Sequence, residues 1–107
     1  MLKHLNRVYL KYFDFLEGTF MQISIDLSLY PLAKEHYKEE IWQFIENLKA
    51  NQHVKVVANG MSTQVFGDYD ETLSFVMAQM KIVHQQVDSA VFICKFIAAD
   101  RFREYDK

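Results

Sequence analysis

From Gln22 to Tyr30 the chain reads Q-I-S-I-D-L-S-L-Y, a strict alternation of apolar and polar side chains. Because successive side chains of a β-strand point to opposite faces of a sheet, this period of two predicts a strand with one buried face. The buried face carries aliphatic residues, and the other face carries Ser24, Asp26, Ser28 and Tyr30. Pro31 follows directly and is the only proline, so we expect the strand to end there.

The segment after this strand predicts a helix and then a hairpin. From Lys34 to about Asn51, apolar residues recur at helical spacing, namely Tyr37, Ile41, Phe44, Ile45 and Leu48. Residues 54–58 have β-branched character, and Asn59-Gly60 is a strong turn signal before a second extended run over 61–67. We therefore expect an amphipathic helix followed by two antiparallel strands.

A second helix and a last strand complete the pattern. Asp68 is a candidate N-cap with Glu71 three residues later, and the apolar stripe that follows consists of Leu73, Val76, Met77, Met80 and Val83. Residues 90–98 are too few and too rich in β-branched and aromatic side chains for a helix, so they predict a fourth strand. We expect its helix side to carry Phe92, Cys94 and Phe96, and its other side Val91, Ile93 and Lys95.

The resulting order β-α-β-β-α-β is that of the ferredoxin-like α+β fold. Right-handed crossovers place both helices on one face of a four-stranded antiparallel sheet, which leaves the other face open. That open face is polar on the first strand and partly apolar on the fourth, and burial against a second subunit would explain the apolar part. Since the first and fourth strands are neighbours in this fold, we also predict a cross-strand pair between Asp26 and Lys95.

Composition narrows the class of protein. With 107 residues, of which 50% are hydrophobic, the chain is long enough for one packed domain. A net charge of -2 argues against nucleic acid as a partner, and no apolar run is long enough for membrane insertion. Cys94 is the only cysteine, which excludes a disulfide framework within the chain and favours a cytoplasmic location.

Two interpretations of residues 1–20 remain open. Their apolar residues lie near helical spacing with basic residues between them, so the segment could be a short amphipathic helix. Alternatively, Met21 is the native start, because Glu17-Gly18 must be encoded by GAR-GGN, which resembles a bacterial ribosome-binding site at a suitable spacing from the Met21 codon. In both cases residues 21–107 form the ligand-binding domain, and residues 1–20 are an extension outside it.

Residues that could carry catalysis or hold a metal are scattered. The four histidines lie far apart in the sequence, and no spacing of His, Cys and carboxylates matches a metal site. His36 with its neighbouring glutamates fits a solvated helix face, and Cys94 fits a buried structural thiol. The three glycines form no phosphate-binding loop. We therefore expect no catalytic residues, no metal and no cofactor.

Small polar side chains gather where the first strand ends. Ser28 and Tyr30 close that strand, and Met61-Ser-Thr-Gln64 begins the hairpin strand expected beside it. Hydroxyl and amide groups at one end of a sheet, with Tyr30 or Trp42 able to stack, suit a flat heteroaromatic ligand. Ordinary exposed strand residues would give the same pattern, and spacing alone does not separate the two interpretations.

Two short motifs resemble those of the YkoF-like thiamine/hydroxymethylpyrimidine-binding family. They are Ser28-Leu-Tyr-Pro31 at the end of the first strand, and Met61-Ser-Thr-Gln64 followed by Gly67-Asp68 before the second helix. The resemblance covers residues 22–98. It implies a ferredoxin-like fold and a non-enzymatic protein that binds thiamine or its hydroxymethylpyrimidine moiety, linked to vitamin B1 uptake or salvage.

The resemblance also implies which residues bind. It favours Ser28, Tyr30, Ser62 and Thr63 as ligand-binding residues, with Gln64 and Asn59 as weaker additions. The best-known family architecture duplicates the domain within one chain. Because a single copy is present here, a homodimer or larger homo-oligomer through the sheet would replace the internal pair. The alternative function is a protein-interaction or regulatory subunit of the same fold without a small-molecule ligand.

Overall fold

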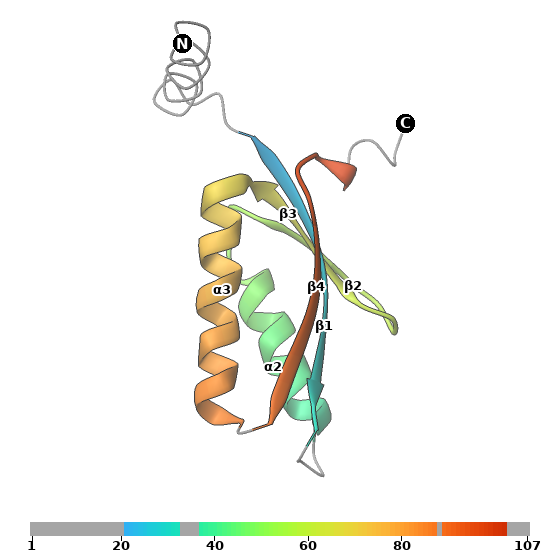
Figure 1. The fold of residues 1–107 in the computed structure, drawn as a ribbon, viewed down its shortest axis with the longest axis vertical. Helices are drawn as coiled ribbons and strands as arrows, with labels where there is room; N and C mark the ends of the chain where they lie inside the picture. The colour runs from blue at the N-terminus through green and yellow to red at the C-terminus, as the bar shows by residue number, and fades with distance from the viewer. Residues whose placement is uncertain (1–20, 33–36, 88, 103–107) are drawn as a thin grey trace, which may run out of the picture.

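A computed structural model describes residues 21–32, 37–87 and 89–102. In chain order the elements are β1 (Gln22–Pro31), α2 (Tyr37–Lys49), β2 (Lys55–Ala58), β3 (Thr63–Asp68), α3 (Tyr69–Gln86) and β4 (Ala90–Ile97). This order confirms the predicted ferredoxin-like fold, and Figure 1 shows both helices on the same side of the sheet. The predictions for residues 1–20, for a helix start at Lys34 and for the face around His36 lie outside the described residues.

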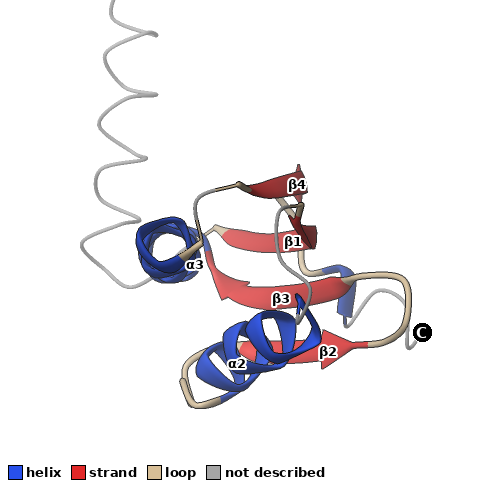
Figure 2. Cartoon of the chain, turned by 90° about the horizontal axis from the view of Figure 1, so that it is seen from below, coloured by secondary structure: helices blue, strands red, loops and turns tan. Residues whose placement is uncertain are grey.

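The four strands form one antiparallel sheet in the order β2-β3-β1-β4. Strand β1 is central and pairs with β3 on one side and β4 on the other, so β2 and β4 are the edges. In this register Asp26 lies opposite both Gln64 of β3 and Lys95 of β4. The helices cover one face, and the chain after β4 turns onto the opposite, open face (Figure 2).

The aliphatic face of β1 is the centre of the core, as its alternation predicts. Ile23, Ile25 and Leu27 are fully buried, and they share one cluster with Leu48 of α2 and Val76 of α3. Burying a side chain of this size stabilises the fold by about 1.5–3 kcal/mol. A slip of one residue would turn the polar face of β1 into this core, so the alternation also fixes the register of the sheet.

The N-cap of α3 is Asp68, as predicted, and its Oδ2 accepts a hydrogen bond of 3.0 Å from the Glu71 amide. This bond satisfies one of the amides that a helix leaves unpaired at its start. The predicted apolar stripe is right for Val76 and Val83, which are buried, but wrong for Met77, which is 55% exposed. Met77 lies one residue past Val76, about 100° round the helix, and so faces away from the sheet.

The predicted faces of β4 are confirmed by its register with β1, but the residues on the helix side differ in burial. Phe92 and Cys94 pack against the core from the helix side. Phe96 shares that side with its cross-strand partner Ile25 but is 53% exposed. The predicted side of Phe96 is therefore right, although more than half of the residue stays exposed near the end of this edge strand.

Candidate functional site

Five of the six predicted site residues line one cavity of about 280 Å³, which we call the sheet-end pocket. It lies where β1 ends, between the β2–β3 turn and helix α2, with Leu27, Ile41 and Ile45 among its apolar lining. The five residues are Ser28, Tyr30, Asn59, Ser62 and Thr63. The Thr63 side chain points to the helix side of the sheet with Leu27, whereas Ser28 and Tyr30 point to the open face, so these residues border the pocket from both sides of the sheet end.

Asn59 builds the turn that forms one side of the sheet-end pocket. Its Oδ1 accepts hydrogen bonds from the backbone amides of Met61 (2.8 Å) and Ser62 (3.1 Å). Its own backbone amide donates to the Ser62 carbonyl at 3.1 Å, which closes the turn. Such side-chain bonds to the following amides are the reason asparagine favours turns. The carboxamide oxygen is therefore already engaged, and only the amide nitrogen of Asn59 is left for a ligand.

The other predicted residues differ in how far they face the sheet-end pocket. Thr63 is buried opposite Leu27, and Tyr30 is half exposed, so its ring is accessible for stacking. Ser28 Oγ donates to the Met61 carbonyl at 3.5 Å, a length at which a hydrogen bond is weak. Trp42, the alternative stacking residue, is exposed on α2 and is not among the pocket's lining residues. The pocket thus offers small neutral hydroxyls beside one aromatic ring.

Gln64 does not join this group, because β3 turns its side chain to the other face of the sheet from Thr63. It lines a larger cavity of about 540 Å³, which we call the open-face cavity. The lining includes Asp26, Lys95 and the apolar residues Val57, Phe66, Ile97 and Phe102. The sequence did not predict this cavity.

The wall of the open-face cavity is the turn that follows β4, and Ser24 holds it in place. Ser24 Oγ donates to the Ala99 carbonyl at 2.7 Å and accepts from the Arg101 amide at 2.9 Å. Phe102 then packs edge-on against Phe66 with ring centroids 5.4 Å apart. Ser24 lies on the open face as predicted, but this turn covers it and leaves it only 6% exposed. The available sequence signal for this wall was Phe102, an aromatic residue in the charged segment that follows β4.

The predicted pair between Asp26 and Lys95 is confirmed. Lys95 Nζ lies 3.6 Å from Asp26 Oδ2, at the edge of the open-face cavity. The Lys95 side chain is largely exposed, so this ion pair is worth at most about 1 kcal/mol. The second oxygen, Asp26 Oδ1, is buried and accepts no hydrogen bond from any described residue.

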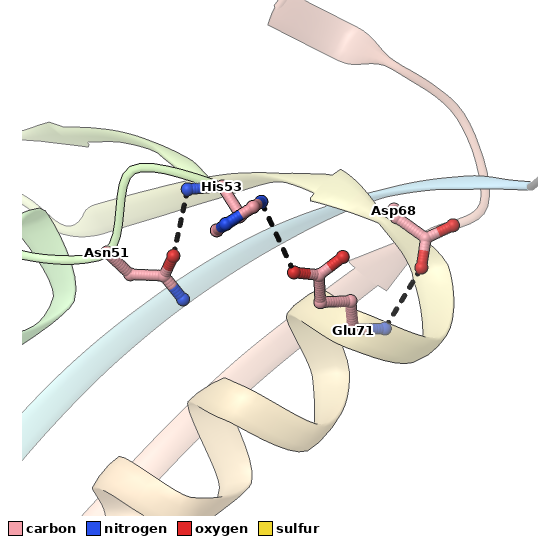
Figure 3. A network of polar contacts seen from close by, with 4 residues as sticks. All are labelled: Asn51, His53, Asp68 and Glu71. Carbon is pink, nitrogen blue, oxygen red and sulfur yellow. Dashed lines mark hydrogen bonds and ion pairs between the residues drawn. The ribbon is translucent and has the colours of Figure 1, made fainter.

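A polar network joins the loop before β2 to the start of α3 (Figure 3). His53 Nδ1 lies 3.6 Å from Glu71 Oε1, and the His53 amide donates to Asn51 Oδ1 at 2.8 Å. Glu71 in turn donates its amide to the N-cap Asp68. Since the His53 and Glu71 side chains are mostly exposed, we interpret the network as a surface contact that supports the helix start.

The described residues were predicted from sequence to lack a metal site, and their titratable side chains form no metal-binding cluster. No group of three or more His, Cys, Asp or Glu side chains there could hold a metal ion. Burial, and secondly the negative charge of Asp26, raise the pKa of the Cys94 thiol above its ordinary value. None of the helices in the described part of the chain has the length and apolar character needed to span a bilayer.

Several solved structures share this fold. A protein of Streptococcus pneumoniae matches with a TM-score of 0.66 and 19% identity over 81% of this chain and 100% of its own. A hypothetical protein of Methanocaldococcus jannaschii matches with a TM-score of 0.63 and 28% identity over 72% of this chain and 79% of its own. A Thermotoga maritima protein is named for a proposed part in thiamine biosynthesis or salvage. It matches with a TM-score of 0.62 and 17% identity over 70% of this chain and 81% of its own.

Comparison by sequence reaches the level of a family. No curated protein matches the chain. The model of the YkoF-related family matches residues 22–99, which run from the start of β1 to just past the end of β4. This range contains both predicted motifs, the sheet-end pocket and most of the open-face cavity. Because the match spans most of the chain, the protein belongs to the YkoF-related family.

Proposed function

We propose that this domain binds thiamine or its hydroxymethylpyrimidine moiety without catalysing a reaction, and that it serves vitamin B1 uptake or salvage in the cytoplasm. The observation that carries the proposal is the sheet-end pocket, in which Ser28, Tyr30, Ser62 and Thr63 line one cavity. Membership of the YkoF-related family supports it, and so does the thiamine-related name of the Thermotoga maritima neighbour.

The chemistry of the sheet-end pocket suits such a ligand. Hydroxyl groups can both donate and accept, so Ser28, Ser62 and Thr63 can serve the amino group, ring nitrogens and hydroxymethyl group of the pyrimidine. Tyr30 can stack on a ring at the open-face edge of the pocket, where the Ser28 side chain also lies. The described residues that line the pocket carry no carboxylate, imidazole or thiol, so they offer no acid–base pair for turnover.

Isothermal titration calorimetry on the full chain tests the proposal. The titrants are thiamine, its phosphates, hydroxymethylpyrimidine and the thiazole moiety alone. We expect saturable binding of thiamine and hydroxymethylpyrimidine and none of the thiazole, with both ligands recovered unchanged by mass spectrometry. Thr63→Val removes a hydroxyl at constant shape and should weaken binding, whereas Ser74→Ala on the exposed side of α3 should not. No heat with any of the titrants would contradict the proposal.

We also propose that two copies of the chain associate through the open face. Apolar side chains of β4 lie exposed there, with Ile93 at 58% and Val91 beside it, and Tyr30 of β1 lies next to them. Isolated exposed apolar residues are ordinary on a protein surface, but a contiguous strip on one sheet face is typical of an interface. The same strip favours the second candidate, an interaction or regulatory subunit that has no small-molecule ligand.

A further inference from the structure

We propose that the free edge of β4 pairs with β4 of a second copy of the chain, antiparallel and centred on Cys94, so that two sheets join into one. This contact goes beyond the association through the open face proposed above, because it uses the edge of the sheet and a different set of side chains. It rests on an unprotected edge strand, on a strand sequence that matches itself in this register, and on a helix flank of matching charge.

Strand β4, the outer strand at one margin of the sheet (Figure 2), lacks the features that normally prevent an edge strand from pairing. Proteins protect such edges with short strands, charged side chains, proline or bulges. β4 has eight residues in unbroken register with β1, no proline, and Lys95 as its only charged residue. The strand at the opposite margin, β2, has only four residues. Large apolar side chains are exposed along β4, namely Val91, Ile93, Phe96 and Ile97.

The sequence of β4 favours a second copy as the strand that covers it. Opposite residues of an antiparallel pair share a face, so all four helices stay on one side only if the two-fold axis passes through a residue of β4. The helix side of β4 carries Phe92, Cys94 and Phe96, a pattern that is symmetric about Cys94. Centred there, Phe92 lies opposite Phe96 of the second copy, and the symmetry makes this aromatic pair twice. The second copy would thus cover the exposed ring of Phe96.

The neighbouring registers are less favourable. Centring on Lys95 would place two lysines directly opposite each other, which destabilises a strand pair. Centring on Ile93 would place Phe96 opposite Ala90, and no aromatic pair would form. Centring on Cys94 places Lys95 opposite Ile93 of the second copy, where the lysine stem can pack on an aliphatic side chain while its charge stays in water.

One flank of α3 lies beside this edge. The His84 ring packs against Phe92 of β4 with centroids 5.2 Å apart, and His84 Nε2 lies 3.2 Å from the Ala90 carbonyl oxygen. Asp70, Met77 and His84 follow one another at intervals of seven residues, about two helical turns, so they share this flank. All three are exposed. The flank therefore points outward past β4 rather than down onto the sheet.

The charges on this flank suit a two-fold contact. Asp70 lies in the first turn of α3, whereas Lys81 and His84 lie toward its end and line one cavity with Met77. The two-fold axis would make the two α3 helices antiparallel across the joined edge. The acidic start of one helix would then face the basic end of the other, with the exposed Met77 side chains between them. The flank is therefore complementary to itself in the same arrangement that β4 requires.

Oxidative cross-linking of the full chain tests the register. Pairing centred on Cys94 places the two thiols directly opposite each other, at a separation that a disulfide can span. Copper–phenanthroline in air removes two electrons and two protons from the thiol pair and passes the electrons to oxygen. We expect a covalent dimer that dithiothreitol cleaves. In Cys94→Ser/Phe96→Cys the thiol is more exposed but lies opposite Phe92, so it should cross-link at least about tenfold more slowly.

Phe96→Glu separates this contact from association through the open face, because residue 96 points to the helix side. Since the symmetry repeats the substitution, cross-linking through Cys94 and the association constant from sedimentation should both fall at least about tenfold. Trp42→Glu makes the same change at an exposed aromatic residue of α2, beside the other half of the sheet, and should alter neither. Circular dichroism spectra check that the variants fold.

Three results would each overturn the inference. They are the absence of a covalent dimer from the wild-type chain, faster cross-linking through position 96 than through Cys94, and unchanged cross-linking in Phe96→Glu. None of them concerns the sheet-end pocket, so the proposed binding of thiamine would stand in each case.

Discussion

At Gly67 the end of β3 passes so close to helix α3 that a methyl group has no room. A Cβ atom there would collide with Thr72 Oγ1 and would lie 3.4 Å from the carbonyl oxygen of His53. Thr72 is fully buried, so its side chain cannot swing into solvent. The glycine that precedes the N-cap Asp68 is therefore required by packing rather than by backbone conformation.

We predict that Gly67→Ala lowers the free energy of unfolding by about 1–3 kcal/mol, the usual cost of overpacking. Urea denaturation measures the loss. In a Thr72→Ala background the colliding hydroxyl is absent, so the same substitution should cost much less. An equal cost in both backgrounds would show that Thr72 is not the reason for the glycine.

A second prediction at this scale concerns Cys94. Burial of its thiol, and secondly the charge of Asp26, raise the pKa of this group. Because only the thiolate is nucleophilic, iodoacetamide should alkylate the folded chain more slowly than the urea-unfolded chain at the same pH. The pH–rate profile of the folded chain should also rise at higher pH than that of the unfolded chain. Since the folded thiol keeps its proton longer, stability should decline once the pH rises past the unfolded pKa. Coincident profiles would contradict the burial of this thiol.

Among the elements, the turn after β4 depends on one side chain. Ser24 Oγ makes both hydrogen bonds that attach this turn to β1, one to Ala99 and one to Arg101. Replacing the hydroxyl would leave two backbone groups without their partner. The contacts of Phe102 with Phe66 and with Lys55 would remain.

We predict that Ser24→Ala speeds hydrogen exchange at the Arg101 amide and lowers stability by about 1–2 kcal/mol. Ser28→Ala is the matched control, because Ser28 lies four residues later on the same face of β1 and makes a bond of 3.5 Å. It should leave exchange at Arg101 unchanged. Equal protection of Arg101 in both variants would mean that Ser24 does not hold the turn.

Elements with a clear period were predictable, and those defined by contacts across the molecule were not. The alternation in β1 and the cap at Asp68 are local signals, and both are confirmed. The exposure of Met77 and Phe96 depends on where the helices and the sheet edge end, which no local pattern states. The open-face cavity depends on residues from β1 and from the end of the described chain, which only the fold brings together.

The same distinction applies to the candidate site. The sequence predicts that Ser28, Tyr30, Ser62 and Thr63 are neighbours at one end of the sheet, and they line one cavity. Gln64 was grouped with them by its position in the chain, although the period of two places it on the opposite face from Thr63. Whether these residues bind a ligand remains a prediction.

For the whole molecule, the open face leads to a prediction about assembly. If two sheets meet there, a charge at the centre of the apolar strip should separate them. We predict that the wild-type chain sediments as a homodimer or larger and that Ile93→Lys sediments as a monomer. Ile82→Lys, at an exposed apolar position of α3, should not change the assembly. A wild-type chain that stays monomeric at all concentrations would contradict an interface on this face.

The most direct measurement is a crystal structure of the chain grown with saturating thiamine. The account predicts density for the pyrimidine ring beside Ser28, Tyr30, Ser62 and Thr63. The ligand should be intact, with the bond between its two rings unbroken. A well-ordered structure with the sheet-end pocket empty would contradict the claim that this pocket binds thiamine.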